Sequence, residues 1–137
     1  MRFDFHALPI LAAGLFIASA AHAAEPRDMS GDYVMKGKGV QAEDRAYSGT
    51  CTFKAEGALY DVSCFNSDTR HTYSGKGLAL GDQFSIVIGD LLKGDHSSAY
   101  VGEYLVVYRV ASDGVLSGRW VHAASGAHGE EMLTPKK

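Results

Sequence analysis

The sequence predicts an all-β fold, most simply an eight-stranded antiparallel up-and-down β-barrel, with a two-sheet β-sandwich as the alternative. Short stretches rich in aromatic and β-branched residues recur after position 23, and none of them has the period of a helix. Sixteen glycines, seven tyrosines and six phenylalanines suggest many turns between aromatic-rich strands. Because strands that follow one another usually pair, a meander that closes into a barrel is the simplest topology.

Residues 1–23 are expected to form a secretory signal peptide and not part of the fold. Arg2 supplies the positive region, positions 8–20 supply an almost purely apolar stretch, and Ala21-His22-Ala23 supplies small residues before a cleavage site. The apolar run is shorter than a comfortable membrane span, although an uncleaved anchor remains the alternative. We therefore expect export to a bacterial periplasm, no membrane anchor after cleavage, and a single β-barrel domain over residues 24–137.

The composition of the chain excludes several classes of function. Lys and Arg number 13 against 16 Asp and Glu, so no basic surplus favours a nucleic-acid partner. The sequence contains no nucleophile elbow, phosphate loop or EF-hand, and no nucleophile–base pair can be placed in it. We expect a protein that is not an enzyme and that needs no cofactor.

The first elements in the chain are a strand over Gly31–Val40, a polar loop over Gln41–Arg45, and a hairpin over positions 46–66. A turn at Gly57-Ala58 sets a register in which Cys51 faces Cys64 at a non-hydrogen-bonded pair, where side chains approach most closely. In an oxidising compartment this favours a Cys51–Cys64 disulfide, since a redox motif or a zinc site would need other spacings or more thiols. The disulfide should act as a structural cross-link.

A second hairpin is predicted over positions 70–89, with its turn at Gly81-Asp82. Its register sets small residues of one strand against large residues of the other, namely Gly75, Gly77 and Ala79 against Ile88, Ile86 and Phe84. A connection over Asp90–His96 leads to the longest strand signal, Ser98–Val110. Alternate positions of that strand share one face because side chains repeat every two residues, and these are Tyr100, Gly102, Tyr104, Val106, Tyr108 and Val110.

The last two strands are predicted over Val115–His122 and His128–Thr134. A three-residue turn over positions 112–114, with Gly114 left-handed, joins the first of them to the long strand. In the resulting register Tyr104 faces His122, Val106 faces Trp120 and Tyr108 faces Gly118, which is an aromatic ring covering a bare glycine. A Tyr-x-Gly pattern also recurs at Tyr47, Tyr73 and Tyr100, and we interpret it as one packing solution used again.

The stretch His96-Ser-Ser-Ala-Tyr-Val-Gly-Glu-Tyr104 is similar to an avidin strand that carries Ser or Thr and an aromatic residue before glycine. Eight hairpin-linked strands behind a signal peptide also resemble the calycin barrels, which include the lipocalins and avidins. The chain has Trp120 alone where avidins have several tryptophans, and Gly31-Asp32-Tyr33 where lipocalins open on Gly-x-Trp. The resemblance implies a barrel that binds a small ligand or a protein.

The candidate ligand-binding residues lie on the inner face of the last three strands, and they are Tyr104, Tyr108, Trp120, His122 and Glu130. A turn at Ala124-Ser125-Gly126 would set His122 opposite His128 and Trp120 opposite Glu130. This cluster could orient a polar ligand head, and Glu130 could anchor a ligand amine or form an ion pair with Arg119 or Arg109. We predict no metal site, because a three-ligand geometry is not established. A register shifted by one residue would separate the two histidines and bring in Glu131.

These observations together predict a non-enzymatic exported protein that holds a small amphipathic or apolar ligand in or at the mouth of a β-barrel. The alternative is a protein-interaction module, such as a periplasmic inhibitor of a lysozyme or a protease, that uses the connection Asp90–His96 or an outward apolar stripe. That stripe, formed by Leu105, Val107 and Val121, could also support a homodimer. An eight-stranded barrel is just wide enough to be filled or to hold one ligand, so an open cavity would favour the first function.

Overall fold

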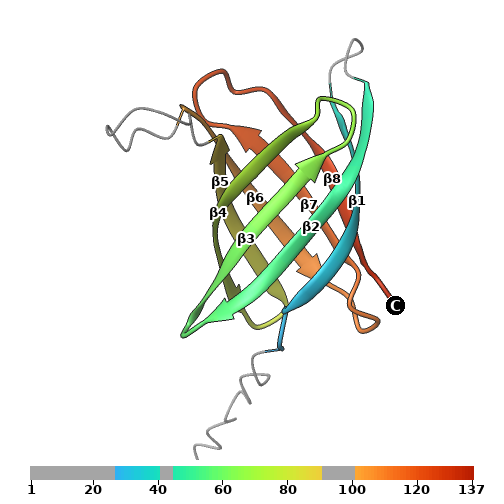
Figure 1. Cartoon of the computed structure of the whole chain (residues 1–137), viewed down its shortest axis with the longest axis vertical. Coiled ribbons are helices and arrows are strands. Elements are labelled where there is room, and N and C mark those ends of the chain that lie inside the picture. The colour runs from blue at the N-terminus through green and yellow to red at the C-terminus, as the bar shows by residue number, and fades with distance from the viewer. Residues whose placement is uncertain (1–26, 41–44, 91–100) are drawn as a thin grey trace, which may run out of the picture.

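Eight antiparallel strands close into a barrel in the computed structural model, which describes residues 27–40, 45–90 and 101–137 (Figure 1). The strands are β1 Gly31–Gly39, β2 Ala46–Glu56, β3 Leu59–Asn66, β4 His71–Leu80, β5 Gln83–Asp90, β6 Val101–Val110, β7 Leu116–His122 and β8 His128–Pro135. Each strand pairs with its neighbours in the chain, and β1 also pairs with β8 to close the sheet. The predicted up-and-down barrel is confirmed, and the alternative of a sandwich is not.

The signal peptide over residues 1–23, most of the connection Asp90–His96 and the predicted strand start at 98–100 lie outside the described residues. Within the described ranges, no helix is long and apolar enough to cross a membrane.

The registers predicted for the first three hairpins are confirmed. Cys51 faces Cys64 between β2 and β3, and their sulfur atoms form a disulfide across two Cα atoms that lie 4.0 Å apart. Between β4 and β5, Gly75, Gly77 and Ala79 face Ile88, Ile86 and Phe84. Between β6 and β7, Tyr104 faces His122, Val106 faces Trp120 and Tyr108 faces Gly118. Glycines with positive φ at positions 57, 81 and 114 set these tight turns, because L side chains rarely adopt that conformation.

The register predicted for the last hairpin is wrong by one residue. Trp120 faces Gly129, and His128 faces Val121. The turn spans four residues, since the His122 N–H donates to the Ala127 carbonyl at 2.7 Å. Strand side chains alternate between two faces, so a slip of one residue exchanges the inner and outer positions of β8.

The physical reason for the longer turn is a side chain that bonds to the turn itself. Nδ1 of His122 lies 2.7 Å from Oγ of Ser125 and accepts the Ser125 backbone N–H at 3.2 Å. Gly126 completes the turn with a φ of 71°. Such local side-chain bonds to the backbone stabilise a turn of particular length, and they are not apparent from the pattern of apolar residues.

One end of the barrel is closed by aromatic rings and by the segment that precedes β1. The rings of Phe53 and Phe84 lie 4.9 Å apart at their centroids, and both side chains are almost fully buried. Met29 packs against this cluster with 2% of its surface exposed, while its carbonyl accepts the Tyr33 hydroxyl at 2.9 Å. Arg27 bonds to the carbonyls of the β6–β7 turn, and so fixes the segment across the barrel end.

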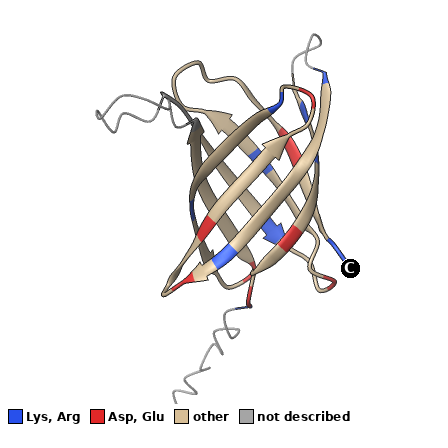
Figure 2. Ribbon diagram, in the orientation of Figure 1, with Lys and Arg blue, Asp and Glu red and all other residues tan. Residues whose placement is uncertain are grey.

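The outer surface mixes charges with one apolar patch. Figure 2 shows Lys and Arg interspersed with Asp and Glu over the strands in view, and Lys76 forms an ion pair with Glu56 and Asp61. The predicted outward positions of Leu105, Val107 and Val121 are confirmed, and all three are exposed. Val87 of β5 faces Leu105, which in turn faces Val121, so the patch continues over β5, β6 and β7.

Reduction of the Cys51–Cys64 disulfide is expected to lower the free energy of unfolding by about 2–3 kcal/mol, because the cross-link closes a short loop that the hairpin already pairs. The barrel should stay folded, since the β2–β3 register does not depend on the sulfur atoms. Urea unfolding of the oxidised and the reduced protein measures the difference. An unfolded reduced protein, or equal midpoints, would contradict this expectation.

Candidate ligand cavity

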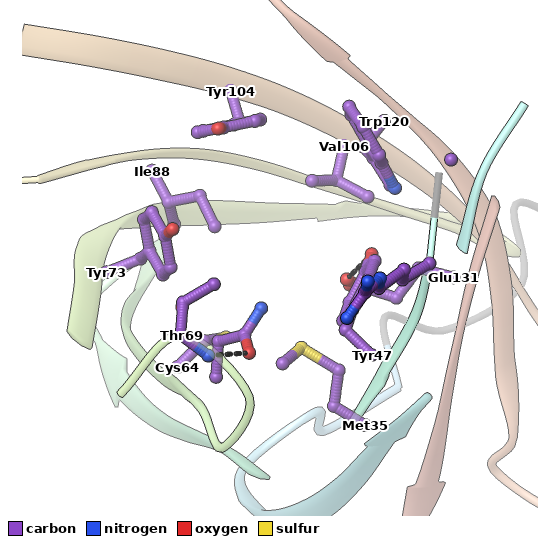
Figure 3. A pocket seen from close by; sticks show the side chains of 13 residues that line it. Met35, Tyr47, Cys64, Thr69, Tyr73, Ile88, Tyr104, Val106, Trp120 and Glu131 are labelled. Carbon is purple, nitrogen blue, oxygen red and sulfur yellow. Dashed lines mark hydrogen bonds between the residues drawn. The ribbon is translucent and has the colours of Figure 1, made fainter. Parts of the chain in front are cut away.

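A cavity of about 250 Å³ lies inside the barrel at the end opposite the Met29 segment (Figure 3). Its rim comes from Gly39 at the end of β1, Arg45 before β2, and Asn66 and Thr69 around the β3–β4 turn. Deeper in the barrel it is bounded by the apolar side chains of Met35, Ile88 and Val106. The barrel is therefore filled at one end and hollow at the other.

Three aromatic rings form adjoining walls of the cavity. The Tyr104 ring lies 5.7 Å from the Tyr73 ring and 5.8 Å from the Trp120 ring, with interplanar angles of 85° and 70°. Figure 3 shows Tyr104 across one side, with Tyr73 and Trp120 on either hand. These edge-to-face contacts hold the rings in fixed positions, so that they form three sides of a box. We refer to Tyr73, Tyr104 and Trp120 as the aromatic box.

The carboxylate of Glu131 lines the same cavity and is held by two tyrosine hydroxyls. The Tyr47 hydroxyl donates to Oε2 at 2.6 Å, and the Tyr108 hydroxyl donates to Oε1. Each carboxylate oxygen thus accepts one charge-assisted hydrogen bond from a different side of the barrel. We refer to Tyr47, Tyr108 and Glu131 as the carboxylate clamp.

Two glycines make the carboxylate clamp possible. Across the sheet the order is Tyr47 on β2, Gly37 on β1, Glu131 on β8, Gly118 on β7 and Tyr108 on β6. A Cβ at Gly37 would lie 2.2 Å from Cζ of Tyr47, and one at Gly118 would lie 2.6 Å from Cδ1 of Tyr108. Each tyrosine ring therefore lies flat over a bare glycine and reaches the next strand.

The electrostatics of the clamp keep its hydroxyls protonated. Burial raises the pKa of Tyr47 and of Tyr108, and the neighbouring Glu131 carboxylate raises both further. Burial also raises the pKa of Glu131, while hydrogen bonds from the two hydroxyls oppose that change. The clamp thus consists of two tyrosine hydroxyls that stay protonated and donate hydrogen bonds, and one carboxyl group that is easier to protonate than an exposed one.

Trp120 carries a buried hydrogen-bond donor, Nε1, that has no partner among the residues that the structure describes. The nitrogen lies near the Tyr47 hydroxyl without forming a hydrogen bond to it. Buried indole N–H groups usually find an acceptor, and the Tyr47 hydroxyl oxygen is a candidate here.

The structure places the five predicted ligand-binding residues at different depths. Tyr104 and Trp120 line the cavity, as their predicted face requires. Tyr108 is fully buried beneath the cavity, and its hydroxyl donates a hydrogen bond to Glu131, which lines the cavity. His122 packs against Tyr104 with ring centroids 4.8 Å apart and bonds to the β7–β8 turn, outside the cavity lining.

Glu130 lies on the outer surface, so its predicted inward position is wrong. It faces Arg119 in the β7–β8 register, and its Oε1 lies 4.0 Å from Nη2 of that arginine. The predicted pairing of His122 with His128 is wrong for the same reason, and His128 is exposed beside Gly126. Among residues 27–40, 45–90 and 101–137, no three His, Cys, Asp or Glu side chains are grouped to hold a metal ion.

The lining residues that were not among the predicted ligand contacts include Arg45, Tyr47, Tyr73 and Glu131, the last of which was considered only for a register shifted by one residue. The Tyr-x-Gly repeat was a usable signal for Tyr47 and Tyr73, because both of these tyrosines line the cavity. Glu131 required the correct register of the last hairpin. Arg45 carried no signal, since it follows a segment that resembles an ordinary polar loop.

Comparison with known proteins identifies no family or relative of the chain, since no model of a protein family matches it and no curated protein matches it either. The likeness to calycins is consistent with the closed eight-stranded antiparallel barrel at that coarse level.

The Gly37→Ala variant tests the carboxylate clamp. A methyl group at Gly37 must displace the Tyr47 ring, which then loses its bond to Glu131, so we expect a cost of about 1–3 kcal/mol in the free energy of unfolding. In a Tyr47→Val background the same substitution should cost less than half as much, because the ring is absent. A double-mutant cycle in urea measures both costs. Equal costs in the two backgrounds would show that the glycine serves another purpose.

The pH dependence of stability tests the partly buried carboxyl group of Glu131. Because burial raises the pKa of Glu131 in the folded state, its contribution to stability is complete below the ordinary glutamate pKa and is lost as pH rises through the raised value. The stability of the wild type relative to Glu131→Gln should therefore increase as pH falls from about 8 to about 4. Urea unfolding of both proteins across this range measures the difference. Parallel curves would contradict a raised pKa.

Proposed function

We propose that this protein is an exported, non-enzymatic binding protein that holds one small amphipathic or apolar ligand in the cavity of its barrel. The observation that carries the proposal is the cavity of about 250 Å³ walled by the aromatic box. Side chains could fill the interior of an eight-stranded barrel completely, as Phe53 and Phe84 do at the closed end. A hollow with apolar walls and a few convergent polar groups is the usual form of a small-molecule site.

The size and lining of the cavity limit the ligand. The volume lies just below the range of about 300–1,000 Å³ that is typical for drug-sized ligands, which favours a smaller molecule. Met35, Ile88 and Val106 offer contact to an apolar part. The carboxylate of Glu131 offers hydrogen bonds to a polar part. A small amphipathic molecule matches this lining.

The proposed periplasmic location rests on two features. The predicted signal peptide over residues 1–23 provides the route of export. The Cys51–Cys64 disulfide is of the kind that forms and persists in oxidising compartments.

A second candidate function, a protein-interaction module such as an envelope inhibitor, is favoured by the outer apolar patch. Val87, Leu105, Val107 and Val121 are exposed side by side over β5, β6 and β7. Clustered exposed apolar residues can mark a site of protein contact, including contact with a second copy of the chain. The patch lies outside the barrel, so its variants can be separated from variants of the cavity.

Native mass spectrometry of the mature protein, purified from the periplasm without denaturation, tests the first proposal. We expect a mass excess of one small molecule in the wild type, because the cavity should retain its ligand. The excess should disappear in Tyr104→Ala and persist in Leu105→Ala, since these neighbours lie on opposite faces of β6. The same ligand added back should change the emission of Trp120, the one tryptophan in the chain.

A bare wild-type mass, together with unchanged Trp120 emission in the presence of periplasmic small-molecule extract, would contradict the ligand-binding proposal. A complex with an envelope protein that is lost in Leu105→Ala and kept in Tyr104→Ala would instead support the second candidate function.

A further inference from the structure

We propose that the cavity is selective for a small organic ammonium ion, with the positive group inside the aromatic box and next to Glu131. The ligand class rests on the proposed function, because it concerns the same cavity. Two independent features of the cavity support it, namely the arrangement of the rings and the position of the carboxylate.

The aromatic box has the arrangement that suits a cation. Tyr104 stands at 85° to Tyr73 and at 70° to Trp120, so the three rings enclose a shared space instead of stacking on one another. Ring faces carry partial negative charge, and the attraction to a cation grows when the cation is shielded from water. Several faces around one space are a known means of binding quaternary ammonium groups, which have no N–H to donate in a hydrogen bond.

The Glu131 carboxylate supplies the opposite charge. Its two oxygens accept one tyrosine hydroxyl each, whereas an ionised carboxylate can accept about four hydrogen bonds. A partly buried carboxylate is costly when no cation pairs with it, and Glu131 forms no ion pair with any residue in the described part of the chain. An ammonium ion in the cavity would provide the missing counter-charge. The raised pKa of Glu131 agrees with a site that lacks one.

The remaining polar groups indicate the orientation of the ligand. Arg45 is exposed at the rim, so water screens its charge from the interior. The carboxylate of Glu131 belongs to the cavity lining, so the positive end of the ligand would point into the barrel. The ammonium group would then lie inside the box, and the uncharged end of the ligand would point toward the rim.

The experiment compares choline with 3,3-dimethylbutan-1-ol, a molecule of the same shape in which an uncharged carbon replaces the ammonium nitrogen. Isothermal titration calorimetry at about pH 8, which favours the ionised form of Glu131, and at low salt gives a Kd for each probe. We expect the wild type to bind choline at least about tenfold more tightly than the uncharged probe. The ratio of the two Kd values is the readout, because a general loss of folded protein weakens both probes equally.

Matched variants assign the charge effect to one carboxylate. Glu131→Gln should lower the ratio several-fold, because it removes the charge and keeps the size of the side chain, while the ring faces of the aromatic box still favour the cation. Glu130→Gln removes the neighbouring charge on the outer surface and should leave the ratio unchanged. Tyr104→Leu keeps an apolar wall but removes a ring face, and it should lower the ratio by a factor of a few.

The outcomes separate this inference from the proposed function. If the wild type binds both probes with equal affinity, or the uncharged one more tightly, the ammonium inference fails while a ligand-binding cavity remains supported. If neither probe binds, the ammonium inference also fails, and the co-purified mass then decides the proposed function alone. A ratio that survives in Glu131→Gln would overturn the role of the carboxylate.

Discussion

The contact between two tyrosine hydroxyls and the carboxylate of Glu131 constrains most of this barrel. It joins β2 and β6 to β8 across β1 and β7, and so spans the pairing of β1 with β8 that closes the sheet. A carboxylate in this position is costly without donors, and the donors reach it only because Gly37 and Gly118 leave room for the rings. The two tyrosines, the two glycines and Glu131 therefore depend on one another, and a substitution at one of them would disturb contacts across all five strands.

The division of the barrel into a filled and a hollow half follows from which residues lie at each level. Near the closed end the inward positions are taken by Phe53, Phe84 and Met29, which contact one another and exclude solvent. Near the open end the rings of the aromatic box pack edge to face along the wall and leave the centre free. The filled half can supply stability while the open half stays available, which is how a rigid scaffold supports a binding site.

The sequence was sufficient wherever a short turn fixed the register. The sequence shows glycines at positions 57, 81 and 114, where tight turns are expected, and counting outward from them gives the Cys51–Cys64 pair and the Tyr104–His122 pair correctly. In the structure these glycines have positive φ, as such turns require. The sequence was insufficient at the β7–β8 turn, where His122 bonds to Ser125 and adds a fourth turn residue. That bond depends on the side-chain rotamer, which alternation of apolar residues does not encode. The cavity volume was not predicted either, because it depends on the rotamers of the aromatic rings.

The one-residue difference in the β7–β8 register changes which carboxylate lies inside the barrel. Glu130 and Glu131 are adjacent in the chain, so the register decides which of them points inward. The expected carboxylate near Trp120 does exist, but it is Glu131, and it arrives with two tyrosine donors that no inspection of Glu130 would suggest. Glu130 instead lies near Arg119 in solvent, where an ion pair contributes little. A negative charge in a shielded, ring-walled space favours an organic cation, whereas the same charge outside would favour nothing in particular. The ligand chemistry that we propose for the barrel therefore follows from the length of one turn.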